Sequence, residues 1–160
     1  MENYVEDKER VARILSRDWF EDGRLLHVAF ALNHGESYLS VNRMSVSSFS
    51  SDVKTFVETH AKYIFGDNQD EYFRALLTVR DIRHIDVEYK GEKLDVAVEV
   101  EPRSAHTKSH AGIFTRYHNK NVKTDGMLTI SHSDEVASDV ILLKVQLSLL
   151  RQSIVENSKL

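Results

Sequence analysis

The sequence contains no cysteine, which excludes disulfides, zinc–thiolate sites and catalytic thiols. Its six glycines are scattered singly, so there is no glycine-rich loop of the kind that cradles nucleotide phosphates. No apolar run approaches the roughly 20 residues that span a bilayer, and the charged opening MENYVEDKERVARIL does not resemble a secretory signal. We therefore expect a cytoplasmic protein without a membrane segment, a metal site or a cofactor.

The chain also lacks a large excess of positive or negative charge. The net charge is −4, and 41% of the 160 residues are hydrophobic and 29% charged, as in ordinary globular proteins. This balance gives no overall electrostatic signature for nucleic acid or an anionic membrane. A chain of this length is typical of one domain with a buried core, so we expect residues 1–160 to form a single domain.

The first quarter of the chain predicts a charged start followed by a β-hairpin. Residues 1–10 are mostly charged, and we expect a frayed end or a short helix there. Asp22-Gly23 is a turn signal, and the alternating apolar residues after it predict a hairpin over residues 24–43. His27, inside the first strand of that hairpin, is expected to be a hydrogen-bonded structural histidine.

The clearest helix lies in SSFSSDVKTFVETHAKYIF, which Ser50 or Ser51 can cap and in which Asp52 suits the first turn. GDNQD at residues 66–70 ends it. His60 lies beside the apolar face of this helix and, like His27, is expected to be a hydrogen-bonded structural histidine. The apolar residues at helical spacing are Val53, Phe56, Val57, Ala61 and Ile64.

The second half predicts further strands and a helix. Residues 72–102 indicate two or three antiparallel strands with a turn at Lys90–Glu92, and Pro102 marks the end of the last one. The tail favours an amphipathic helix, although KVQLSLL also alternates like a strand. Its apolar residues at spacings of four and three are Val136, Val140, Leu143, Leu147, Leu150 and Ile154. The expected fold is α+β, with a mostly antiparallel sheet, one central helix and a C-terminal helix.

A basic segment interrupts this acidic chain at residues 102–124. None of the residues in this segment is acidic, whereas the rest of the chain has 16 basic and 25 acidic residues. Basic residues interleaved with aromatic ones suit a phosphate chain with stacked bases. We therefore predict a basic functional loop, helped by Arg43 at the end of LSVNR, just before a helix N-terminus. The predicted anion-binding or nucleic-acid-binding residues are Arg43, Arg103, Lys108, His110, Arg116, Tyr117, Lys120 and Lys123. The alternative is a solvated loop that balances the acidic face of Asp95, Glu99 and Glu101.

EVEPRSAHTKSHAGIFT, taken with AFALNHGESYLSVNR, resembles a loosely defined group of small bacterial proteins of unassigned function. The group shares a Leu-Ser-Val-type strand and, later, an acidic-Pro step that leads to His-Ala-hydrophobic. The matching residues are Leu39, Ser40, Val41, Glu101, Pro102, His110, Ala111 and Ile113. The resemblance implies that the basic segment is a hallmark of the group, and it brings no activity with it.

The residue types of the sequence suggest three candidate kinds of catalysis. Paired histidines, His106 and His110, have the residue types for metal-free phosphodiester cleavage by general base and general acid. A metal site of these two with His118 is disfavoured because the segment has no neighbouring carboxylate. The serines of SVSSFSS lack the glycines of a nucleophile elbow. Whether the protein is an enzyme stays open.

The leading hypothesis is a binding module whose basic loop recognises RNA or single-stranded DNA. The first alternative is a protein-interaction or accessory subunit of a larger bacterial system, and the second is the small phosphodiesterase. The apolar tail predicts a homodimer or a complex with a larger protein, because a helix that is hydrophobic around most of its girth is normally buried on more than one side. Trp19 and Phe20 are expected to pack at the edge of the core.

Overall fold

The computed structural model describes residues 4–31, 38–64, 70–89, 92–100, 108–117 and 135–160. In these segments seven strands form one antiparallel sheet in the order β6-β7-β8-β4-β1-β5-β9. The strands are β1 (Arg10–Ile14), β4 (Leu39–Arg43), β5 (Glu71–Thr78), β6 (Asp86–Tyr89), β7 (Glu92–Val100), β8 (His110–Tyr117) and β9 (Ile154–Lys159). A separate short hairpin pairs β2 (Phe20–Glu21) with β3 (Arg24–Leu25).

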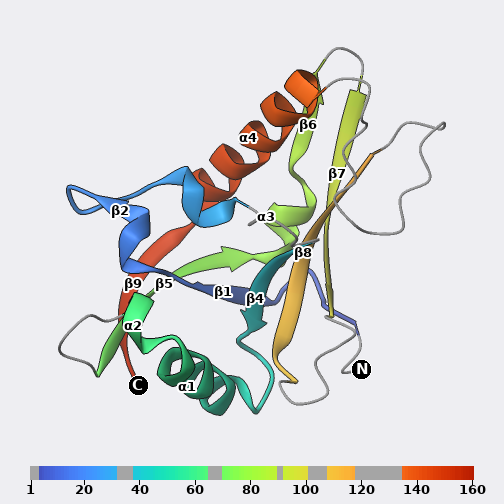
Figure 1. Ribbon diagram of the computed structural model, residues 1–160. Helices are drawn as coiled ribbons and strands as arrows, with labels where there is room; N and C mark the ends of the chain where they lie inside the picture. Colours follow the sequence, from blue (N-terminus) through green and yellow to red (C-terminus); the bar gives the residue numbers. More distant parts are fainter. Residues whose placement is uncertain (1–3, 32–37, 65–69, 90–91, 101–107, 118–134) are drawn as a thin grey trace.

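The helices cover both faces of this sheet. The α-helices are α1 (Phe49–Thr59), α2 (Ala61–Ile64), α3 (Val79–Arg83) and α4 (Glu135–Gln152), and the 3₁₀ helices are η1 (Arg17–Trp19) and η2 (His27–Phe30). Figure 1 shows α4 and η2 on one side of the sheet and α1 with α2 on the other. The expected α+β fold with a mostly antiparallel sheet is confirmed.

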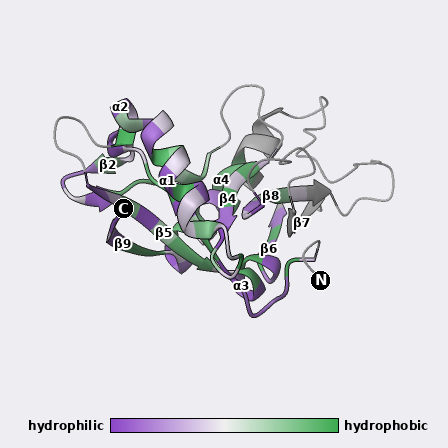
Figure 2. Ribbon diagram, turned by 90° about the horizontal axis from the view of Figure 1, so that it is seen from below, coloured by the Kyte–Doolittle hydropathy of each residue, from purple (hydrophilic) through white to green (hydrophobic). Residues whose placement is uncertain are grey.

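Alternation along the central strands produces two separate cores. Val11 of β1 and Leu15, directly after this strand, belong to the larger core, which contains Val145 and Leu149 of α4, whereas Ile14 belongs to the smaller one. The smaller core consists of Ile14, Val53, Val57, Ile64 and Tyr72, with Phe49 packed against it. In Figure 2 the colours of α1 and β5 alternate between hydrophobic and hydrophilic residues, as two-sided elements of a layered fold require.

Residues 4–10 are packed against the domain, contrary to the frayed end or short helix that the sequence predicts. Val5 is 1% exposed and belongs to the larger core. Glu9 is buried, and the backbone N–H of Val79 donates to its carbonyl oxygen. The high charge of this stretch misled the prediction, because one of its carboxylates has a buried partner.

The predicted hairpin over residues 24–43 is half right. The turn at Asp22-Gly23 exists, with φ of 50° and 77°, and the strand Leu39–Arg43 ends at the residue where the predicted hairpin ends. After the turn the chain has only the two-residue strand β3 and then η2, with Ala29 and Phe30 buried and His27 exposed. Adjacent buried residues suit a 3₁₀ turn better than the alternating burial of a strand.

The C-terminal helix is confirmed, and it packs on the larger core through Val145, Leu149 and Leu150. Val145 and Leu149 are buried, whereas Leu143 and Leu147 are 41% and 37% exposed. Ile154 lies beyond the helix, in β9. The apolar spacing identified a helix correctly but could not tell which of its apolar residues the packing on the sheet would bury.

The basic segment is in part a strand inside the sheet. β8 lies between β7 and β4, and Ala111, Ile113 and Phe114 are buried. Its partner β7 starts at Glu92, at the end of the predicted turn, and α3 separates the strands β5 and β6 that the sequence runs together. The prediction of a functional loop over the whole of residues 102–124 is therefore wrong for the described residues 110–117.

Candidate functional site

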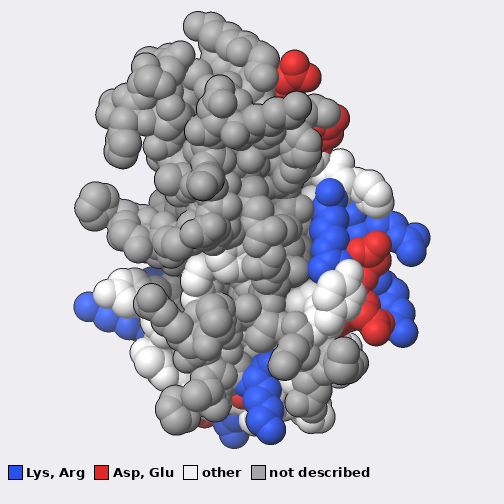
Figure 3. All heavy atoms as spheres, turned by 90° about the vertical axis from the view of Figure 1, so that its right-hand side faces the viewer, with Lys and Arg blue, Asp and Glu red and all other residues white. Residues whose placement is uncertain are grey.

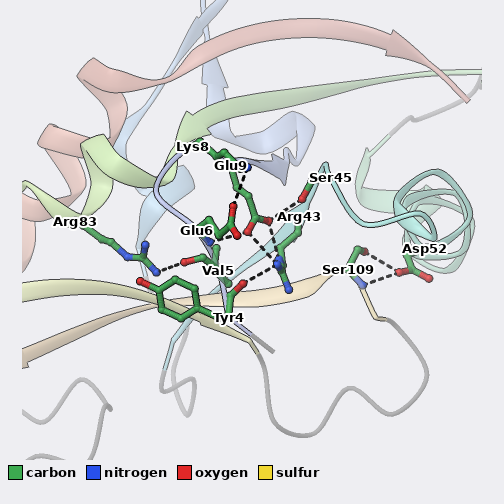
Figure 4. Close-up of polar contacts among 10 residues, drawn as sticks. All are labelled: Tyr4, Val5, Glu6, Lys8, Glu9, Arg43, Ser45, Asp52, Arg83 and Ser109. Atoms are coloured by element: carbon green, nitrogen blue, oxygen red, sulfur yellow. Dashed lines mark hydrogen bonds and ion pairs between the residues drawn. The ribbon is translucent and has the colours of Figure 1, made fainter. Parts of the chain in front are cut away.

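Arg43, predicted to bind an anion at the surface, has a buried carboxylate as its partner. Its Nε donates to Oε1 of Glu9 at 2.9 Å, and its Nη2 donates to Oε2 of Glu9 at 2.9 Å and to the carbonyl oxygen of Tyr4 at 3.0 Å. Both side chains are 6% exposed. Figure 4 shows the pair enclosed by the N-terminal segment and the end of β4. This guanidinium joins elements of the fold and is not offered to an external ligand.

The same contacts explain the acidity of Glu9. Burial alone would raise the pKa of this carboxyl, but hydrogen bonds from Arg43, the backbone N–H of Glu6 and the Ser45 hydroxyl outweigh burial and lower the pKa to about 2. Glu9 therefore stays ionised at neutral pH, and the pair is a bidentate ion pair in a dry site.

A second buried polar cluster ties α1 to the start of β8. Oδ2 of Asp52 accepts hydrogen bonds from the backbone N–H and the hydroxyl of Ser109, at 3.0 and 2.7 Å, and from the Ser48 hydroxyl at 2.8 Å. Nδ2 of Asn42 donates to the Ser109 oxygen at 2.9 Å. Ser109 is 0% exposed, so this hydroxyl holds elements together and cannot reach a substrate (Figure 4).

Of the remaining predicted residues, the structure describes the side chains of Lys108 and His110. Lys108 is exposed beside β8, and His110, at the first position of that strand, lies 6.5 Å from the Tyr38 ring, centroid to centroid. Arg116 and Tyr117 lie at its end. The predicted residues outside the described segments are Arg103, His106, Lys120 and Lys123. On the face shown in Figure 3, the described Lys and Arg side chains lie apart or beside acidic ones.

A cleft on the opposite side of the fold carries a better set of groups. It has a volume of about 440 Å³ and lies between η1 with its flanking residues and the α1–α2 pair. Ligand pockets typically have about 300–1,000 Å³. The cleft is lined by Arg13, Ile14, Ser16, Asp18, Trp19, Ser40, Phe56, His60, Tyr63 and Ile64. It thus combines four rings with charged and hydroxyl side chains.

One wall of the cleft is Trp19, which Arg13 supports from below. The Arg13 guanidinium lies 4.9 Å from the Trp19 ring centroid. Its Nε donates to the carbonyl oxygen of Ala29 at 2.5 Å, and its Nη1 donates to that of Ser40 at 2.8 Å. Arg13 itself is only 7% exposed. A residue fixed to two backbone segments in this way holds the indole in a set position.

The other wall is a stripe of rings at the end of α1 and in α2. The rings of Phe56 and His60 stack at 4.3 Å, and the Lys62 ammonium lies 6.0 Å from the Tyr63 ring centroid. Phe56 is 39% and Tyr63 57% exposed. His60 bonds to the carbonyl oxygen of Phe56 through Nδ1 at 2.9 Å, which assigns the proton to Nδ1 and makes Nε2 the acceptor of the neutral ring.

Ser16 joins the two walls at their base. Its hydroxyl donates to the carbonyl oxygen of Tyr63 at 3.3 Å and accepts from the backbone N–H of Asp18, also at 3.3 Å. Asp18 is exposed at the cleft and contributes a carboxylate. A smaller apolar hollow of about 260 Å³, lined in part by Phe20 and Phe73, shares Ile64 with the cleft. The aromatic surface therefore continues past α2.

This arrangement suits binding better than bond cleavage. The described residues contain no group of three or more His, Asp or Glu side chains placed to hold a metal ion. The cleft offers one histidine and one carboxylate, with exposed rings as its main feature. Flat rings in such a cleft can stack on other flat rings, and charged groups at its rim can select among them.

Sequence reasoning placed these residues elsewhere. The prediction that Trp19 and Phe20 pack at the edge of the core is confirmed, and His60 is hydrogen-bonded as expected. Phe56, one of the apolar residues at helical spacing, is 39% exposed. The missed signal is the spacing of Phe56, His60 and Tyr63, at i, i+4 and i+7, which places three rings along one helical stripe.

No protein-family model, curated protein or solved structure matches this chain. In the part of the chain that the structure describes, no helix has both the length and the apolar character needed to cross a bilayer. The proposal below therefore rests on the geometry of the cleft.

Proposed function

We propose that the protein is a binding module for single-stranded RNA or DNA, and that bases of the strand stack on the rings of the cleft. The observation that carries the proposal is the pairing of rings with cations. Trp19 has the Arg13 guanidinium at 4.9 Å, and Tyr63 has the Lys62 ammonium at 6.0 Å. The proposal keeps the ligand class that the sequence predicts and moves the binding residues from the basic segment to the cleft.

Stacking explains why a protein of negative net charge would bind such a ligand. Every base has a π-face, so stacking on aromatic side chains tolerates any sequence and contributes about 1–3 kcal/mol per base. Arg17 is exposed next to the cleft, as is Lys62, and either cation can meet a phosphate. With few cations available, the binding should depend on salt less steeply than that of a protein with a long basic groove.

The test is a titration with short single-stranded oligonucleotides, read out by the fluorescence of Trp19, the only tryptophan in the chain. Base stacking on or beside the indole should change its emission. Tyr63→Ala should weaken binding by about 5- to 150-fold, since one stacking contact is lost. Tyr4→Ala is the matched control, because Tyr4 is 61% exposed beside Arg83 but lies outside the cleft.

Three results would overturn the proposal. They are a titration without any change at low salt, an equal loss of affinity in Tyr63→Ala and Tyr4→Ala, and binding of a proline-rich peptide by the cleft with no binding of oligonucleotide. The bound oligonucleotide should also be recovered intact, and its cleavage would favour the phosphodiesterase alternative. A nucleic-acid partner would agree with the cytoplasmic location that the sequence predicts.

A further inference from the structure

The two edges of the sheet are protected to different degrees. At one edge, β6 is four residues long, α4 packs against it, and the Lys144 ammonium donates to the carbonyl oxygen of Glu88 at 3.4 Å. At the other edge, β9 has six residues and pairs only with β5 within the described segments. Short strands and lysines are common devices against edge-to-edge pairing, and β9 has one lysine near its end and no proline.

The hydrogen bonds of β9 identify the backbone groups at the open edge. The backbone N–H of Leu160 donates to the carbonyl oxygen of Asp70, on the β5 side. Alternate residues of an antiparallel strand bond to opposite sides, so Ile154, Glu156 and Ser158 also bond toward β5. The backbone groups of Val155, Asn157 and Lys159 point to the open edge.

The side chains of β9 leave apolar surface at both ends of one face. Ile154 is 63% exposed and Leu160 is 44% exposed. Because side chains alternate along a strand, these two residues lie on the same face, the one on which the Arg74 guanidinium pairs with Glu156. Figure 2 shows that β9 begins hydrophobic and becomes hydrophilic toward its end.

We propose that β9 pairs with β9 of a second copy of this chain, which extends the sheet across a two-fold axis. The axis must be perpendicular to the sheet, because only then do both copies keep the same faces on the same side. Open-edge residues must then lie opposite open-edge residues, so Asn157 meets its own copy and Val155 meets Lys159. In this register Ile154 of each copy faces Leu160 of the other.

Self-complementarity is the reason for choosing a second copy as the partner. A single register pairs all three open-edge residues of both strands and brings the two exposed apolar side chains together twice. The exposed Leu143 and Leu147 of α4 lie outside this contact, so the interface differs from the helical one that the sequence predicts. This inference goes beyond the proposed function and does not depend on what the cleft binds. An interface of one strand pair is small, so the dimer is expected to be weak.

The test is sedimentation equilibrium from low to several hundred micromolar protein. The native chain should approach twice its mass of 18.4 kDa as the concentration rises. Asn157→Pro should stay monomeric, because it removes an N–H at the open edge, where proline is tolerated. Circular dichroism establishes whether this variant is folded, and the charge variants below test the register without changing the backbone.

Two charged versions of the interface test the register directly. Ile154→Lys/Leu160→Lys and Ile154→Glu/Leu160→Glu should each be monomeric, because like charges face each other twice. A mixture of the two should form a heterodimer, since opposite charges then meet. Leu143→Ser/Leu147→Ser is the control and should dimerise like the native chain.

Each contrary result overturns the proposal. A native chain that is monomeric at every concentration has no such interface. A dimer that survives both charged versions, or a mixture that fails to associate, uses another surface or register. Loss of the dimer in Leu143→Ser/Leu147→Ser would assign the interface to α4, as the sequence predicts.

Discussion

The two faces of the sheet are covered unequally. Among the residues whose burial the structure describes, the larger core, under α4 and η2, contains seventeen and includes the fully buried leucines and isoleucine Leu15, Leu77, Ile82 and Leu149. The smaller core, under α1 and α2, contains five. The α1–α2 wall of the proposed cleft belongs to this thinner cover, whereas Trp19 on its other wall packs against the larger core. Incomplete cover leaves rings such as Tyr63 exposed, which a full layer would bury.

Two of the buried polar clusters in the described residues lie on opposite faces of the sheet and have different structural roles. The Glu9–Arg43 pair joins the N-terminal segment to β4 beside the larger core, near Val5 and Val11. Asp52 attaches α1 to the start of β8 on the thinner face. Loss of the first cluster should destabilise the whole domain, whereas loss of the second should mainly loosen the helix that carries the rings.

The largest effect is expected from Arg43→Met. It leaves the buried carboxylate of Glu9 without its ionic partner, and removal of one partner from a buried pair costs about 3–5 kcal/mol. Urea unfolding measures the loss. Lys8→Met breaks the exposed Lys8–Glu6 pair, whose side chains are 82% and 48% exposed, and should change stability by less than about 1 kcal/mol. Equal effects of the two substitutions would contradict a structural role for Arg43.

A fall in pH should reveal how much the same Glu9–Arg43 pair contributes to the free energy of unfolding. The pKa of Glu9 is lowered from 4.5 to about 2, so its contribution to stability is complete above pH 4.5 and is lost as the pH falls toward 2. Unfolding free energies measured across this window should therefore fall more steeply in the native chain than in Glu9→Gln. Parallel curves would show that Glu9 titrates normally.

A smaller and more local effect is expected from Asp52→Asn. The amide keeps one acceptor but cannot serve all three donors as well as a carboxylate does, so we expect a loss of about 1–3 kcal/mol. Hydrogen exchange should speed up in α1 more than in β1 or β5, and the Trp19 emission should change because Phe56 and His60 shift. Asp81→Asn, exposed in the first turn of α3, is the control. Uniform loss of protection across the sheet would contradict the division between the two faces.

The sequence predicted what depends on local patterns. Alternation predicted a strand that ends at Arg43, as β4 does. Helical spacing with an acidic first turn predicted one helix up to residue 65, whereas the structure has α1 from Phe49 to Thr59 and then the separate α2. The turn at Asp22-Gly23 follows from residues that tolerate positive φ. Each of these features is decided by neighbours within about four residues in the chain.

The predictions that failed concern features that depend on contacts between residues far apart in the chain. Arg43 looked like a surface cation because its partner, Glu9, lies 34 residues earlier. The basic segment looked like a loop because its burial depends on β4 and β7 as neighbours. The cleft combines Trp19, which packs against the larger core, with Tyr63 of α2, and no local pattern reports that these two distant segments meet.

The smallest effect is expected from Leu147→Ala, and it tests which side of α4 faces the thicker core. Leu147 is 37% exposed and Leu149, two residues later, is 1% exposed. Replacement of the exposed leucine should change unfolding free energy by less than about 0.5 kcal/mol, because alanine is at least as good a helix former. The same substitution at Leu149 opens a cavity and should cost about 2–5 kcal/mol. Both leucines lie in the same helix and both are replaced by alanine. A difference in unfolding free energy between the two variants, measured in urea, therefore reports the difference in burial. A reversed order would mean that α4 packs on the sheet through its other side, and the larger core would then be built around Leu143 and Leu147.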